Sequence, residues 1–316
     1  MLSNDLKKVA VIGTGVIGAG WIIRCLAHNK KVVAFDKDLK LKKKLIAEIK
    51  RTWPYVKKLF NKKKLNLKNF KYVTSIEEAL KEADFIQECV SENYAIKTKL
   101  MGIIGKYAKP NAIISSSSSG LLPTRIYSKC NNPARTMIGH PFNPVYMCPG
   151  VEVVPGKKTK KKFLNKANKF YKSISMNPIM VKKELPGYLA DRLQEALWRE
   201  ALHIVNEGYA STKDLDRAIE DGPGLRWSLM GIFLTYHLAG GKAGMKHMLE
   251  QFGPALKLPW TKLKAPKLSK KLSSRVIFGT RQQAKGKSVA MISNIRDEYL
   301  VNLQKLRKRY ENKIRK

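Results

Sequence analysis

An apolar strand that runs straight into a glycine-rich turn is the feature that most restricts how this chain can fold. Residues 8–12 read Lys-Val-Ala-Val-Ile, which is typical of a strand buried on both faces of a parallel sheet. A helical stretch follows over about 16–28, and a second apolar run occupies 31–35. Strand, helix and strand in this order predict a βαβ unit with two parallel strands.

The turn after the first strand has the spacing Gly-x-Gly-x-x-Gly, and a carboxylate ends the second strand. The first glycine permits the tight turn, the second lets the backbone approach a pyrophosphate, and the third allows close packing of helix on strand. The carboxylate accepts the ribose hydroxyls of NAD and repels the extra phosphate of NADP. The residues that we expect to bind NAD here are Gly13, Gly15, Val16, Ile17, Gly18 and Asp36.

Further strand-like segments near residues 72, 85 and 113 alternate with helical stretches. Two short β segments around a loop follow within 135–154. Alternation of strands and helices is typical of a parallel sheet covered by helices on both faces. We therefore predict an α/β fold with an N-terminal Rossmann-type, doubly wound sheet.

The strand pattern stops near residue 184, and apolar residues then recur at helical spacing. Helices are expected over 186–205 and about 225–239, with a capping box at Ser211 opening another helix between them. We predict two domains: a Rossmann domain for NAD binding over 1–184, and an all-helical substrate and dimerisation domain over 185–316.

Composition limits the class of protein. The 62 Lys+Arg against 24 Asp+Glu give a formal net charge of +38, but the lysines recur along the whole chain without a basic arm. We interpret them as a solvated surface and expect no specific nucleic-acid partner.

Four scattered cysteines fit neither a disulfide framework nor a zinc site, so no metal is expected. The first strand leaves no room for a signal peptide, and no apolar stretch approaches the ~20 residues of a membrane span. We expect a soluble cytoplasmic protein.

His140 and Glu152 are the candidates for proton transfer. A neutral imidazole can take the proton of an alcohol near pH 7, and a carboxylate on a neighbouring strand can hold the ring in one tautomer. The two residues flank a loop that can fold back and bring them together. On spacing alone, an ordinary strand-end histidine and a surface glutamate remain an equal alternative.

Several segments together resemble the 3-hydroxyacyl-CoA dehydrogenase superfamily over essentially the whole chain. They are the glycine turn, Glu92-Asn93, the serine run 115–119, the Gly-His-Pro-Phe-Asn-Pro segment 139–144, and Glu152. The resemblance implies an NAD-dependent oxidoreductase. The roles that it implies are His140 as base, Glu152 as its partner, Ser119 and Asn143 near the substrate oxygen, and Glu92 and Lys97 near the nicotinamide.

Two positions depart from the family pattern. The family usually has Asn before the Arg-Leu pair that here reads Asp191-Arg192-Leu193, so the role of that Asn cannot be carried over. Serines also replace the usual Asn-Thr-Ser, which weakens the assignment of Ser119.

The second half resembles the L-carnitine 3-dehydrogenase branch of the superfamily, in segments 189–202, 224–227, 240–247 and 251–260. This resemblance implies conversion of L-carnitine and NAD to 3-dehydrocarnitine and NADH, and a homodimer. The trimethylammonium of carnitine has no N–H to donate and is commonly held against aromatic faces. The candidates for this contact are Phe142 and Phe252, then Trp198, Trp227 and Tyr146, while Arg192, Arg199 and Arg226 are candidates for the carboxylate.

Three other functions remain open. A 3-hydroxyacyl-CoA such as 3-hydroxybutyryl-CoA is the main rival substrate, and the positive charge of the chain would attract the CoA phosphates. A sugar-acid dehydrogenase of the lambda-crystallin type is another. A polyanion-binding module on a dinucleotide fold would use the basic helix near 39–64, but it gives no reason for His140 and Glu152.

Overall fold

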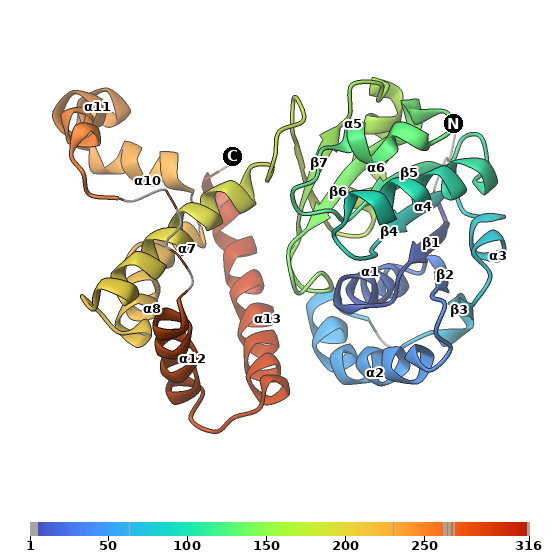
Figure 1. Ribbon diagram of the computed structural model, residues 1–316, viewed down its shortest axis with the longest axis horizontal. Helices are drawn as coiled ribbons and strands as arrows, with labels where there is room; N and C mark the ends of the chain where they lie inside the picture. The colour runs from blue at the N-terminus through green and yellow to red at the C-terminus, as the bar shows by residue number, and fades with distance from the viewer. Residues whose placement is uncertain are drawn as a thin grey trace. The chain divides into compact units, whose positions relative to one another are not determined.

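The computed structural model describes residues 6–62, 64–229, 231–261, 264, 267 and 269–314. The chain forms two compact units, Met1–Arg192 and Leu193–Lys316. The first has a sheet with helices on both faces, and every regular element that the structure describes in the second is a helix (Figure 1). The predicted fold class, an α/β domain followed by helices, is confirmed.

Among the described residues, eight strands form one sheet in the order β3-β2-β1-β4-β5-β6-β7-β8. Neighbouring strands are parallel except β6 and β7, which are antiparallel. The chain leaves β1 on one side for β2 and β3 and returns on the other side for β4, which opens a crevice at the carboxyl edge. The strands are β1 (Lys8–Ile12), β2 (Lys31–Phe35), β3 (Phe70–Val73), β4 (Phe85–Glu88), β5 (Ile113–Ser116), β6 (Thr136–Pro141), β7 (Gly150–Pro155) and β8 (Asn177–Met180).

Helices cover the sheet because alternate strand residues point to opposite faces. On one face Phe85 stacks on Phe170 of α6, with 3.8 Å between ring centroids, and Tyr171 packs against Trp21 of α1. On the other face Ile86 joins a core with residues of α3 and α4. The helices of this unit are α1 (Val16–Ala27), α2 (Leu41–Phe60), α3 (Ile76–Leu80), α4 (Tyr94–Tyr107), α5 (Pro123–Ile126) and α6 (Lys161–Ser173).

Arg24 of α1 fixes a loop that follows β6. Its side chain is fully buried, and its guanidinium donates hydrogen bonds to four backbone carbonyl oxygens. Burial lowers the pKa of Arg24 to about 10, so the group is still charged at neutral pH. Charged donors make the stronger hydrogen bonds, and here they tie α1 to two loops. The acceptors belong to Val145, Cys148, Ile174 and Ser175.

The second unit is built from helices in sequence. The predicted capping box is present, since Ser211 and Asp214 exchange backbone and side-chain hydrogen bonds at the start of α8. The predicted single helix over 225–239 is wrong, because Gly231 is extended and starts a separate helix. The helices are α7 (Ala190–Glu207), α8 (Thr212–Glu220), α9 (Pro223–Trp227), α10 (Ile232–Ala239), α11 (Gly244–Phe252), α12 (Lys270–Ala284) and α13 (Val289–Ile314).

The helix expected from residue 186 begins later, at Ala190. Gly187 and Tyr188 both have positive φ, +70° and +44°, so neither can belong to a right-handed helix. The first residues of α7 are part of the first compact unit, and they prove to bear on the site described below.

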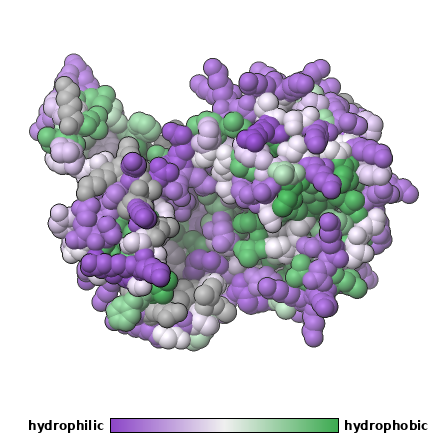
Figure 2. All heavy atoms as spheres, viewed as in Figure 1, coloured by the Kyte–Doolittle hydropathy of each residue, from purple (hydrophilic) through white to green (hydrophobic). Residues whose placement is uncertain are grey.

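The surface reflects the lysine-rich composition. Hydrophilic side chains cover much of the visible face of the first unit, with smaller hydrophobic areas between them (Figure 2). Within the described part of the chain, no helix combines the length and the apolar character that crossing a membrane requires.

Candidate active site

The glycine turn has the geometry that its three roles require. Gly13 has φ +98°, and a Cβ on Gly18 would lie 1.9 Å from the Gly13 carbonyl oxygen, so both positions exclude larger residues. A Cβ on Gly15 would meet nothing within 4 Å. Gly15 and Val16 are exposed at the start of α1, where the first backbone N–H groups of a helix have no partner within it. The open space at Gly15 and the free helix end fit a pyrophosphate.

Asp36 lies next to this turn. Its Oδ2 accepts hydrogen bonds from the backbone N–H of Thr14 at 3.0 Å and from the Thr14 hydroxyl at 2.9 Å. Asp36 therefore fixes the middle of the glycine turn, and its Oδ1 accepts the backbone N–H of Asp38 at 3.4 Å, just beyond the end of β2. This position fits the predicted contact with a ribose.

His140 and Glu152 face each other across the antiparallel pair β6 and β7. They are directly paired in the strand register, and His140 Nδ1 lies 2.8 Å from Glu152 Oε2. The histidine is 6% exposed and the glutamate is fully buried. The structure thus brings together the two residues that were proposed as a pair, and Glu152 engages the Nδ1 atom of the ring.

Glu152 is also bound to the start of α7. Its Oε1 accepts hydrogen bonds from the backbone N–H groups of Leu189, at 2.9 Å, and Ala190, at 3.0 Å. Burial by itself would raise the pKa of Glu152, but the hydrogen bonds from His140 and from these N–H groups outweigh burial and lower it. The carboxylate is therefore held ionised, which favours one tautomer with the proton on His140 Nδ1.

Three further side chains surround the His140 ring. Phe142 and Tyr188 lie with ring centroids 5.5 and 5.6 Å from it. Asp191 Oδ2 is 3.8 Å from His140 Nε2. Phe142 was a predicted substrate contact. Tyr188 was not predicted, because no sequence motif marks it; it is fully buried and donates a hydrogen bond to the Leu121 carbonyl.

The serine run ends beside Glu92. The Glu92 Oε1 accepts the Ser118 hydroxyl at 2.5 Å and the backbone N–H of Ser119 at 2.9 Å. Ser119 is exposed, and so is Asn143 after β6. Continuing the β5–β6 register from Ser116–Ile138 by two residues brings the serine run level with His140. These exposed polar side chains therefore lie at the same edge of the sheet as the dyad.

Lys97 is engaged in a buried ion pair. Its Nζ lies 2.8 and 3.0 Å from the two carboxylate oxygens of Glu88, and both side chains are at most 1% exposed. Glu92 is a weaker partner at 3.6 Å. Glu88 was not among the predicted site residues, although a carboxylate at the end of an apolar strand was a signal for it.

The other predicted substrate contacts lie elsewhere in the chain. Arg192 is exposed at the start of α7, and its backbone N–H donates to the Gly187 carbonyl. Trp198 and Phe252 belong to the second unit and are 50% and 47% exposed. Their contacts with substrate remain predictions. The reserve candidate Tyr146 is buried in the core.

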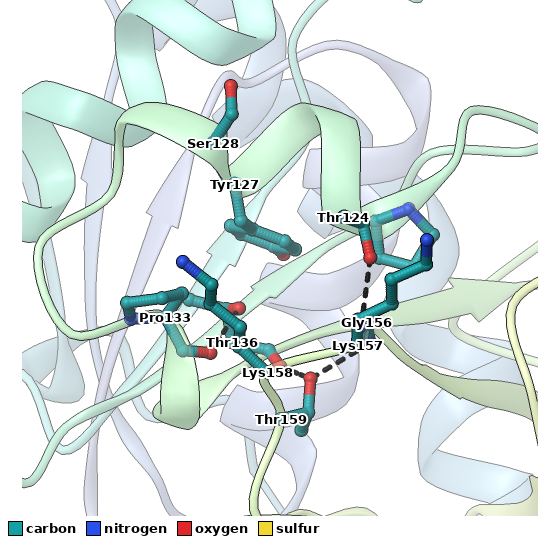
Figure 3. Close-up of a pocket in the computed structure, with 10 residues that line it drawn as sticks. Thr124, Tyr127, Ser128, Pro133, Thr136, Gly156, Lys157, Lys158 and Thr159 are labelled. Atoms are coloured by element: carbon teal, nitrogen blue, oxygen red, sulfur yellow. Dashed lines mark hydrogen bonds between the residues drawn. The ribbon is translucent and has the colours of Figure 1, made fainter.

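A hollow of about 190 Å³ lies at the opposite end of β6 from His140 (Figure 3). Its hydroxyl groups already serve the fold: Thr124 accepts the backbone N–H of Lys157, and Thr159 accepts that of Gly156 and donates to the Thr136 carbonyl. The hydrogen bonds around the hollow therefore stabilise the loops at this end of β6, away from His140.

Two family models match successive parts of the chain. The NAD binding domain of 3-hydroxyacyl-CoA dehydrogenase matches residues 8–185, and the C-terminal domain matches residues 187–283. The chain belongs to the 3-hydroxyacyl-CoA dehydrogenase family. Its first unit is accordingly an NAD-binding domain, which agrees with the geometry of the glycine turn.

Within the 3-hydroxyacyl-CoA dehydrogenase family, the chain is similar to proteins named L-carnitine dehydrogenase. The protein of Oceanobacillus iheyensis is 51% identical over 298 residues, which cover 94% of this chain and 97% of the relative. The protein of Pseudomonas aeruginosa is 48% identical over 298 residues, covering 94% and 93%. Among solved structures, an FHMPC 5-dehydrogenase has the same fold, with a TM-score of 0.80, 21% identity and coverage of 96% of this chain and 99% of the other.

Proposed function

We propose that this protein oxidises the 3-hydroxyl of L-carnitine to 3-dehydrocarnitine with NAD, using His140 as general base and Glu152 as the residue that orients it. The His140–Glu152 pair is the observation that carries the chemistry. The choice of substrate is supported by relatives named L-carnitine dehydrogenase that are 44–51% identical over most of their length.

Proton removal is the task of the dyad. His140 Nδ1–H donates to Glu152, so Nε2 carries the lone pair that accepts the proton of the substrate hydroxyl. The imidazolium that forms is stabilised by the ionised carboxylate 2.8 Å away. When bound, NAD supplies the acceptor for the hydride that leaves the carbinol carbon. In the reverse reaction the imidazolium returns the proton to the alkoxide.

The cofactor fits the residues at the carboxyl edge of the sheet. The space in front of Gly15 and the start of α1 would hold the pyrophosphate, and Asp36 would accept the ribose hydroxyls. We assign Val16 and Ile17 to the backbone contacts with the phosphates, and Glu92 and Lys97 to the nicotinamide end. Ser119 and Asn143 are proposed as hydrogen-bonding partners of the substrate oxygen.

We also propose a division of labour between domain 1–184, which binds NAD and carries the dyad, and domain 185–316, which contributes to substrate binding and dimerisation. Phe142, Phe252, Trp198 and Arg192 are the proposed substrate contacts.

The homodimer proposal is supported by exposed apolar residues on α13, namely Ile295, Tyr299 and Leu306, at 58%, 61% and 49% exposure. Light scattering tests it, since glutamate at Ile295 and Leu306 should convert a dimer to monomers.

The decisive experiment is NADH formation by the purified protein with a panel of L-carnitine, D-carnitine, 3-hydroxybutyrate and 3-hydroxybutyryl-CoA. Strong and L-selective turnover of carnitine is the expected result. Turnover of the CoA ester without turnover of carnitine would overturn the proposed substrate and leave the fold, the cofactor and the dyad in place.

A further inference from the structure

The carboxylate of Asp191 lies beside the ring nitrogen of His140 that faces away from Glu152. Its Oδ2 is 3.8 Å from His140 Nε2, while His140 Nδ1 is engaged by Glu152 at 2.8 Å. The Asp191 side chain keeps 29% of its surface exposed, whereas Glu152 is fully buried. A second carboxylate therefore stands on the open side of the dyad, where a substrate hydroxyl has to approach Nε2.

Position 191 is fixed by the same contacts that hold the dyad. The N–H groups of the two preceding residues donate to Glu152, so the first turn of α7 is anchored to the glutamate that orients His140. The carboxylate of Asp191 is thus positioned by backbone geometry next to the reacting atom. The anchoring of α7 to Glu152 therefore holds Asp191 beside the ring nitrogen that we propose faces the substrate.

The chemistry of L-carnitine matches a carboxylate at this place. Its quaternary nitrogen is on the carbon next to the carbinol, so nitrogen and hydroxyl oxygen are about 3–4 Å apart for ordinary bond lengths and staggered torsions. A hydroxyl that meets His140 Nε2 brings one of the two arms of L-carnitine close to Asp191, and the negative charge of Asp191 favours the cationic arm over the carboxylate arm. The nitrogen carries no hydrogen, so a nearby negative charge and an aromatic face are what can bind it. Phe142 supplies such a face beside the same imidazole.

The net charge of the protein is a second reason to expect a carboxylate beside the cationic group of the substrate. L-Carnitine is a zwitterion, so a formal net charge of +38 attracts its carboxylate and repels its trimethylammonium. A carboxylate beside the reacting nitrogen reverses that bias locally, over the short distance at which the substituent is bound.

We propose that Asp191 is the counter-ion for the cationic group next to the reacting carbinol, and that it makes the site selective for L-carnitine over 3-hydroxy acids that lack a cationic group. The proposal rests on the proposed function, since it needs L-carnitine to be the substrate. Asp191 acts on substrate binding through its charge and takes no proton in the reaction.

The test compares L-carnitine with its carbon analogue, in which an uncharged tert-butyl group replaces the trimethylammonium and the carboxylate is kept. The variant Asp191→Asn removes the charge and keeps the shape. It should lower kcat/KM for L-carnitine about ten-fold or more, mainly through KM, because a partly buried charge loses its partner. For the tert-butyl analogue, kcat/KM of Asp191→Asn should stay within about two-fold of the wild-type value. Asp191→Glu should retain a preference for the cation.

A matched control is Glu82→Gln, which removes one exposed carboxylate that pairs with Lys8 at 2.9 Å, far along the chain from α7. It should change neither substrate. NADH binding by each variant verifies that the cofactor domain is folded. Equal losses of Asp191→Asn on both substrates would overturn the proposal and make Asp191 a group that acts on His140. An unchanged preference would overturn it as well. A wild-type protein inactive on L-carnitine would instead overturn the proposed function, and the inference with it.

Discussion

His140 and Glu152 are opposite neighbours in the ladder of β6 and β7, so the hydrogen bond between Nδ1 and Oε2 joins residues already aligned by the backbone. Side chains directly opposed on one face of an antiparallel pair lie close together, which places the dyad without help from a flexible loop. The geometry needed for proton transfer is therefore a property of the sheet itself. Because Nδ1 is bound to Glu152, Nε2 is the ring nitrogen that we propose as the proton acceptor.

Removing the imidazole should abolish most of the turnover. We expect His140→Ala to lower kcat by about a hundred- to ten-thousand-fold, the range typical of a lost general base. Binding of NADH should remain close to that of the wild type, because the glycine turn is formed by other residues. Steady-state kinetics and NADH fluorescence titration check the two halves. A fully active variant would end the assignment of His140 as base.

The Glu152 carboxylate should stabilise the fold in a pH-dependent way. Its pKa in the folded state is lowered, so its contribution is fully present above the ordinary glutamate pKa of about 4.3 and is lost as the pH falls through the lower folded-state value. Glu152→Gln lacks this titration. The difference in unfolding free energy between wild type and Glu152→Gln should therefore shrink below about pH 4. Urea denaturation from neutral to acidic pH measures it, and a difference independent of pH would contradict the prediction.

Alanine at two glycines of the same turn should affect two different properties, thermal stability at Gly18 and NADH binding at Gly15. Gly18→Ala places a Cβ against the Gly13 carbonyl and should lower the thermal stability of the protein. Gly15 has an ordinary φ of −64° and open space in front of it, so Gly15→Ala should fold normally. It should weaken NADH binding by about ten-fold or more, because the methyl group occupies the space intended for the pyrophosphate. Thermal melts and NADH titration of the pair distinguish packing from ligand contact.

Lys97 and Glu88 should contribute to the stability of the fold together, so that losing one partner destabilises the protein more than losing both. Lys97→Met leaves the fully buried Glu88 carboxylate without its cation, which should cost about 3–5 kcal/mol of unfolding free energy. Adding Glu88→Gln removes the unpaired charge and should recover a large part of that loss. Denaturant titrations of the single and double variants test this. Equal stability of the two variants would show that the charge is neutralised in some other way.

The parts of this protein that could be predicted from sequence are those encoded over short distances. The strand 8–12, the glycine turn and Asp36 follow one another within a single βαβ unit, so local pattern and the rules for parallel sheets were sufficient. The capping box at Ser211 is likewise a four-residue signal. His140 and Glu152 were proposed as a pair because the chain between them is short.

The remaining features depend on contacts between distant residues. The start of α7 follows the turn at Gly187 and Tyr188, and its anchoring depends on hydrogen bonds from Leu189 and Ala190 to Glu152, 37 and 38 residues earlier, which no local pattern reveals. The closeness of Asp191 to His140 follows from the same contact, so position 191 stood only as a question at the level of sequence. The Glu88 pairing with Lys97 likewise joins a strand end to a helix.

The acceptors around Arg24 have a further consequence. All four are main-chain oxygens, so the hydrogen bonds from Arg24 to the loops at Val145–Cys148 and Ile174–Ser175 do not depend on which side chains those loops carry. The side chains of Val145, Tyr146 and Ile174 are themselves buried, so we expect substitutions to be tolerated at the exposed Ser175 and the half-buried Cys148 while the backbone next to Phe142 stays in position. A single buried cation thereby holds the backbone of both loops while their exposed positions can change, which gives a protein of this fold a route to a different hydroxy acid without rebuilding its scaffold.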